Sequence, residues 1–138
     1  MREIKFRGIH KNPYGDTWVH GYYALRDGEH VIIMPHRTNY ENALKENRVI
    51  PVISVAHTID YNTLGQFTGL YDKQGEEIYE GDIVEWDEEK YVIEWTEDTA
   101  RFELVGEDVI YDFDNVYPKK ELEVIGNIYE NSELLKEE

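Results

Sequence analysis

The sequence contains no cysteine, only four prolines and no long apolar run. The lack of cysteine excludes disulfide bridges, thiolate metal sites and a cysteine nucleophile, and it is compatible with a reducing compartment. No apolar segment approaches the roughly 20 residues that a membrane-spanning helix needs. The first ten residues, MREIKFRGIH, alternate charged and apolar side chains and lack the apolar core of a signal peptide. We therefore expect a soluble cytoplasmic protein without membrane contact.

Basic residues are scarce in the second half of the chain. Leu70 to Glu138 holds 23 Asp or Glu and 6 Lys or Arg, whereas Met1 to Gly69 holds 7 and 8. The resulting charges of −17 and +1 sum to the −16 of the whole chain. Aromatic residues make up 13% of the chain, and disordered acidic tails lack them, so the acidic half is expected to fold. Its charge would repel phosphate, which argues against direct binding to nucleic acid or to an anionic membrane.

Short apolar and β-branched segments separated by polar turns recur along the chain and predict a mainly β fold, between all-β and α+β. We expect a single domain, 1–138, with possible subdomains 1–62 and 63–138. The first would be a β-meander with a helix, and the second a small, acidic SH3-like barrel. The expected strands are Glu3–His10, Thr17–Leu25, His30–Met34, Val49–His57, Phe67–Tyr71, Glu77–Tyr79, Ile83–Trp86, Lys90–Trp95, Arg101–Val105, Val109–Phe113 and Leu122–Tyr129.

Two short helices are also expected. Thr38 and Glu41 have the spacing of a capping box, which predicts a helix at about 39–46. Asn131 can cap a second short helix near the end of the sequence, Ser132–Lys136.

The segment 63–86, TLGQFTGLYDKQGEEIYEGDIVEW, contains two turns marked by glycine. Asp72-Lys73-Gln74-Gly75 fits a type I turn followed by a left-handed glycine, and Gly81-Asp82 fits a second turn. Glycine supplies positive φ, and aspartate accepts hydrogen bonds from nearby amides. A phosphate-binding glycine loop is the alternative, but the segment lacks the P-loop pattern and its lysine. We interpret the following residues as structural turn residues: Thr68, Gly69, Asp72, Gly75, Gly81 and Asp82.

Four segments resemble the YopX family of phage and prophage proteins: MREIKFRG, WVHGYY, the segment 63–86, and VIGNIYENSELL. The resemblance covers the first 25 residues and most of residues 63–131. It implies a small, β-rich protein encoded by a phage or prophage, and it implies self-association into a homo-oligomer. It implies no activity and supplies no catalytic residue.

No pattern of catalytic or metal-binding residues stands out. The histidines have neither HxH nor HExxH spacing, and there is no GxSxG or triad signature. Two histidines could meet Asp16 or Asp60 to bind a metal, but scattered histidines are usually polar surface residues. We therefore predict no catalytic, cofactor-binding or metal-ligating residue, and we favour a non-catalytic role. The alternative is a small hydrolase or metal-dependent enzyme that uses carboxylates and histidines of the N-terminal half. The histidines are His10, His20, His30, His36 and His57.

Carboxylates alternate with apolar residues on the expected strands of the second half, which places them on one face of a sheet. Such a face can serve solubility and protect sheet edges. Residues i and i+2 of a strand lie about 6.6–7 Å apart, close to the spacing of successive phosphates, so the face could also occupy a basic site on a nucleic-acid-binding protein. Another interpretation is pure assembly through buried aromatic residues. The candidate partner face consists of Glu85, Glu94, Glu103, Asp108, Asp112 and Asp114.

Overall fold

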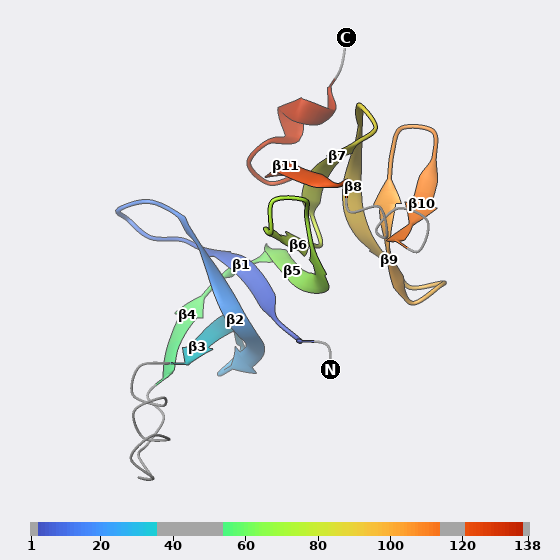
Figure 1. Ribbon diagram of the computed structural model, residues 1–138. Coiled ribbons are helices and arrows are strands. Elements are labelled where there is room, and N and C mark those ends of the chain that lie inside the picture. Colours follow the sequence, from blue (N-terminus) through green and yellow to red (C-terminus); the bar gives the residue numbers. More distant parts are fainter. Residues whose placement is uncertain (1–2, 36–53, 114–120, 137–138) are drawn as a thin grey trace, which may run out of the picture. The chain divides into compact units, whose positions relative to one another are not determined.

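The computed structural model describes residues 3–35, 54–113 and 121–136, and these are mainly β, as the sequence predicts (Figure 1). The chain divides into two compact units, a first unit of residues 4–64 and a second unit of residues 65–138 with 1–3. The predicted helix at 39–46 lies outside the described residues. The elements are β1 Phe6–His10, β2 Thr17–Arg26, β3 Glu29–Pro35, β4 Ser54–Thr58, β5 Asp60–Tyr71, β6 Glu77–Tyr79, β7 Asp82–Trp86, β8 Glu89–Thr96, β9 Arg101–Val105, β10 Ile110–Asp112, β11 Glu123–Asn127 and the 3-10 helix η2 Ser132–Leu135.

The first unit is an antiparallel meander of β1, β2 and β3. Its two outer strands, β1 and β3, both lie beside the segment 54–64. Strands β1, β2 and β3 pair in sequence order, and β4 pairs with β3. After Ile59, β4 continues into β5, which lies beside β1. The Ile9 amide accordingly donates to the Thr63 hydroxyl oxygen at 2.8 Å. The segment 54–64 therefore pairs with β3 through β4 and lies beside β1 through the start of β5.

A glycine sets the spacing of β2 and β3 in this unit. A Cβ at Gly21 would lie 2.2 Å from the carbonyl oxygen of Ile33. Any side chain would therefore push the strands apart and disturb Ile32, which is fully buried next to this contact.

The second unit contains a five-stranded antiparallel sheet in the order β10-β9-β8-β7-β11. Strands β7 to β10 follow one another, and β11 returns to pair with β7 on its other side. The sequence predicts a small SH3-like barrel in this half of the chain. Within the described residues, the outer strands β10 and β11 are not hydrogen-bonded neighbours, so the sheet has two free ends. One face carries the core cluster Ile78, Val84, Tyr91, Ile93, Phe102, Leu104 and Leu122.

Most strand predictions agree with the structure to within two residues, and the exceptions are the starts of β1 and β5 and the form of the C-terminal helix. β1 begins at Phe6 instead of Glu3, β5 begins at Asp60 instead of Phe67, and β11 ends two residues early, at Asn127 instead of Tyr129. The C-terminal helix is a single 3-10 turn that ends at Leu135. β5 extends further because its first half lies beside β1, a pairing between distant parts of the chain that no local pattern marks.

Candidate functional site

The predicted turn residues Asp72 and Gly75 form hydrogen bonds that involve backbone amides. Asp72 is buried, and its carboxylate accepts hydrogen bonds from the amides of Gln74, Glu76 and Val124, at 2.9, 2.9 and 3.0 Å. Gly75 has a φ of +85°, and its amide donates to the Asp72 carbonyl oxygen at 3.0 Å. Asp72 thus joins the β5–β6 hairpin to the start of β11.

The remaining predicted turn residues lie next to β6, and two of them form hydrogen bonds to its backbone. The Thr68 hydroxyl donates to the Ile78 carbonyl at 2.8 Å, and the Asp82 carboxylate accepts from the Tyr79 amide at 2.7 Å. Gly69 and Gly81 have φ values of +88° and +91°, which favour glycine. These hydrogen bonds of the Thr68 hydroxyl and the Asp82 carboxylate join β5 and the start of β7 to backbone groups of β6.

The predicted partner face is partly assembled by the sheet register. Glu94 lies opposite Glu103, and Glu103 lies opposite Asp112, so the three form one row across β8, β9 and β10. Arg101 offsets one of the three negative charges of this row, because its guanidinium lies 3.1 Å from a Glu103 oxygen and 3.5 Å from an Asp112 oxygen. Glu103 is buried, and the hydrogen bonds from the Thr96 hydroxyl and then from Arg101 lower its pKa. The row is therefore largely an internal network.

The other predicted members lie apart from this row. Glu85 lies opposite Lys90 on one side and Glu123 on the other, at the far end of the same sheet face. Asp108 is exposed in the connection between β9 and β10. Asp114 lies outside the described residues.

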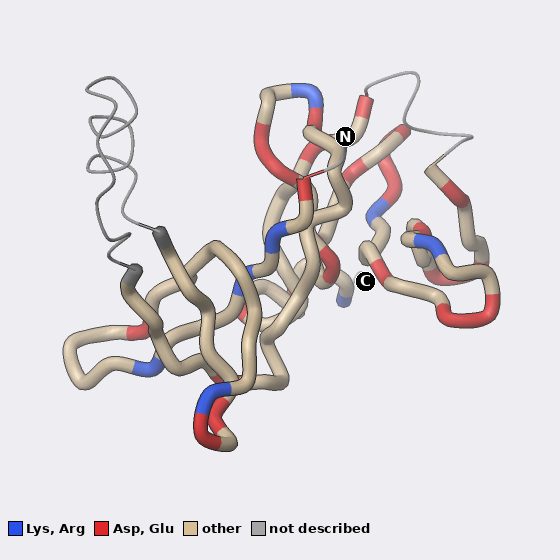
Figure 2. Tube along the Cα trace, turned by 90° about the horizontal axis from the view of Figure 1, so that it is seen from below, with Lys and Arg blue, Asp and Glu red and all other residues tan. Residues whose placement is uncertain are grey.

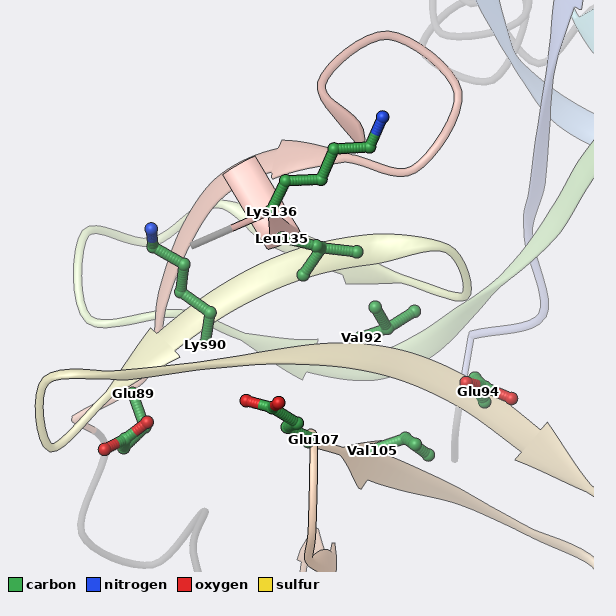
Figure 3. Close-up of a pocket in the computed structure, with 9 residues that line it drawn as sticks. Glu89, Lys90, Val92, Glu94, Val105, Glu107, Leu135 and Lys136 are labelled. Atoms are coloured by element: carbon green, nitrogen blue, oxygen red, sulfur yellow. The ribbon is translucent and has the colours of Figure 1, made fainter. Parts of the chain in front are cut away.

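Two pockets of the second unit share Val92 and Glu94 of β8. The larger, of about 420 Å³, lies at η2 (Figure 3). Figure 3 shows Leu135 close to Val92, with Glu89 and Glu94 at opposite ends of β8. The smaller pocket, of about 400 Å³, lies at the β6–β7 turn. We call the two together the acidic groove, which is lined by Glu80, Gly81, Glu89, Lys90, Val92, Ile93, Glu94, Trp95, Val105, Gly106, Glu107, Ile128, Tyr129, Leu135 and Lys136.

The charges of the acidic groove are unevenly paired. Glu89, Glu94 and Glu107 make no ion pair with any other described residue, and all three are exposed. Burial raises the pKa of Glu80, and the nearby negative charge of Glu94 raises it further. Among the described residues, Lys90 and Lys136 line the larger pocket, whereas no basic residue lines the smaller one. The groove therefore presents unpaired carboxylates beside the apolar residues Val92, Val105 and Leu135.

The groove lies in the half of the chain that carries the negative charge. Figure 2 shows Asp and Glu along much of the second unit, where Lys and Arg are few. Sequence patterns identified only Glu94 among the groove carboxylates. Glu80, Glu89 and Glu107 flank turns, and no spacing rule links these turns to η2.

The histidines of the first unit converge only in part. The rings of His10 and His57 have their centroids 4.9 Å apart, whereas His30 stacks on Tyr61 with centroids 4.1 Å apart. His20 is exposed, and His36 lies outside the described residues. In the described ranges no group of three or more His, Asp or Glu side chains could hold a metal ion.

Comparison with known proteins places the chain in a family and a fold. The family model described as "YopX protein" matches residues 23–136. The crystal structure of protein EF1440 from Enterococcus faecalis is similar with a TM-score of 0.51 and 24% sequence identity, over 99% of this chain and 100% of that one. This likeness concerns the fold. No curated protein matches the chain. Within the described part, no helix is long and apolar enough to cross a membrane.

Proposed function

Because the chain belongs to the YopX family of phage proteins, we propose that it is a non-catalytic binding module whose acidic groove receives a basic segment of a partner protein. The main support is the set of unpaired carboxylates, Glu89, Glu94 and Glu107, beside an apolar floor. A lysine or arginine of the partner would lay its apolar stem along Val92 and Val105 and direct its charge to a carboxylate.

The groove suits this role better than the row of Glu94, Glu103 and Asp112. In the row, Glu103 is buried and shares Arg101 with Asp112, so these two carboxylates are less accessible to a partner than the exposed carboxylates of the groove. In the groove, two lysines stand against four glutamates, which leaves it negative. A partner that normally binds nucleic acid fits this charge, because its basic residues would be attracted to the groove.

Ion pairs and apolar contacts contribute differently to the free energy of such binding. An exposed ion pair contributes about 0–1 kcal/mol, so the carboxylates mainly accelerate association and select the partner. Affinity would come from covering Val92, Val105 and Leu135, of which Leu135 is 40% exposed. Because exposed charges are screened over about 8–10 Å at physiological ionic strength, binding should weaken as salt rises. We place this binding in the host-cell cytoplasm.

The test compares two variants with equal charge change. Glu94→Gln with Glu107→Gln neutralises the groove, and Glu97→Gln with Asp98→Asn removes two charges from the exposed β8–β9 turn outside it. Immobilised wild type should capture from host lysate basic proteins that elute between low and moderate salt. The groove variant should lose them, and the turn variant should retain them.

Equal capture by the two variants, or elution that does not depend on salt, would contradict the role of the groove. Self-association is a separate prediction. Light scattering at two salt concentrations tests it, and a monomer at both concentrations would refute it.

A further inference from the structure

Two histidines that are distant in the sequence meet in the first unit. His10 ends β1, and His57 lies in β4. The segment 54–64 contacts both β3 and β1, and this brings the His57 ring within 4.9 Å of the His10 ring, centroid to centroid, at an interplanar angle of 59°. Both residues are half-buried, so solvent ions can reach them.

The hydrogen bond of His10 determines which ring nitrogen is free. Its Nδ1 lies 2.7 Å from the carbonyl oxygen of Thr58. A carbonyl oxygen only accepts, so Nδ1 must carry the hydrogen, and the neutral ring keeps its lone pair on Nε2. Histidines that bind metal use this arrangement, in which a backbone carbonyl orients the ring and fixes its tautomer.

The separation of the ring centroids leaves room for one metal ion between the two rings. With metal–nitrogen bonds of about 2.1 Å and a roughly tetrahedral angle, two imidazoles on one ion have ring centres about 5 Å apart. Asp16 adds negative charge close to His10, although the Asp16 carboxylate forms an ion pair with Lys11 at 2.9 Å. We propose that His10 and His57 form a two-histidine site for a divalent transition-metal ion such as Zn²⁺, Ni²⁺ or Cu²⁺, with water at the remaining positions.

This site is independent of the acidic groove and has its own selectivity. Imidazole nitrogen favours Cu²⁺, Ni²⁺ and Zn²⁺, whereas carboxylates favour Mg²⁺ and Ca²⁺. A chain with 30 Asp and Glu also binds cations through carboxylates, so the experiment must separate the two modes.

The experiment uses the full chain without a histidine tag. Ni²⁺ is titrated by calorimetry, and the histidine ring signals are followed by NMR. The wild type should bind one Ni²⁺ with selective broadening of the His10 and His57 signals, and Mg²⁺ should leave these signals unchanged. His57→Ala should weaken Ni²⁺ binding at least tenfold, since a chelate of two ligands is reduced to one.

The matched control is His20→Ala, which removes an exposed histidine of β2 and should leave Ni²⁺ affinity unchanged. His57→Ala is preferred to His10→Ala because His10 also donates a hydrogen bond to the Thr58 carbonyl oxygen, and its removal would change that contact as well. Wild-type affinity in the His57 variant, or equal broadening of the His20 and His57 signals, would overturn the proposal. So would the absence of Ni²⁺ binding at millimolar concentration.

Discussion

Removing the Asp72 carboxylate should destabilise the second unit more than its position in a hairpin turn suggests. Its oxygens accept from three backbone amides, two within the turn and one, that of Val124, from β11. The residue is only 7% exposed. Asp72→Ala would leave all three amides without their acceptor.

The size of the effect follows from where these amides lie. Gln74 and Glu76 are exposed, so water can replace the carboxylate at a cost of about 0.5–1 kcal/mol each. The Val124 amide lies in a half-buried strand residue, where losing a charged acceptor costs about 1.5–2 kcal/mol. Asp72→Ala should therefore lower the free energy of unfolding by about 3 kcal/mol. Asp72→Asn should cost less, because one oxygen remains.

The assay is urea unfolding in a Trp18→Phe background, so that fluorescence comes only from Trp86 and Trp95 of the second unit. The neighbouring variant Lys73→Ala is the control. It removes an ion pair with Glu123 at 3.4 Å between partly exposed side chains, and this should cost less than about 1 kcal/mol. If Asp72→Ala and Lys73→Ala lose the same stability, the carboxylate does not join the hairpin to β11 as argued.

Three further predictions concern single positions. Glu88 has a φ of +67° in the β7–β8 turn, so Glu88→Gly should raise stability by about 1 kcal/mol in urea unfolding, and a loss would contradict the strain argument. Gly21→Ala should cost about 3 kcal/mol or prevent folding, measured by circular dichroism, because the new Cβ meets the Ile33 carbonyl at 2.2 Å; near-native stability would refute this contact. The pKa of Glu80 is raised in the folded state, so protonation favours folding. Its contribution should be most favourable below the unfolded pKa and decline as pH rises through the folded pKa. Glu80→Gln should flatten this dependence between acid and neutral pH and slightly raise the urea midpoint at pH 7, and Glu94→Gln should have a smaller effect in the same direction.

Local patterns predicted the strands of the second unit well. The bounds of β6 and β9 agree with those expected, because both strands lie between clear turn signals and β9 alternates polar and apolar residues over its first four positions. The same alternation placed Glu94 and Glu103 on one face. It did not predict that Glu103 is buried against Thr96 and Arg101, since that depends on which side chains the neighbouring strands bring together.

Features that depend on long-range pairing were missed. The first half of β5 was not predicted, because Asp60, Asn62 and Gln66 interrupt its apolar pattern and its partner β1 is distant in the sequence. The larger pocket of the groove requires Leu135 of η2 to lie beside Val92 of β8, and no residue spacing records that contact. The meeting of His10 and His57 has the same origin.

The sequence by itself determined the mainly β fold, the turns of the segment 63–86, the family and the concentration of negative charge after Leu70. These follow from periodicity, turn chemistry and composition, which act over a few residues or over whole segments. Only the tertiary structure decided which carboxylates are free. Arg101 forms ion pairs with two of the predicted carboxylates, Glu103 and Asp112, whereas Glu94 remains unpaired beside an apolar floor. The physical reason is that ion pairing depends on distances of a few ångströms between strands, and these are set by register and packing.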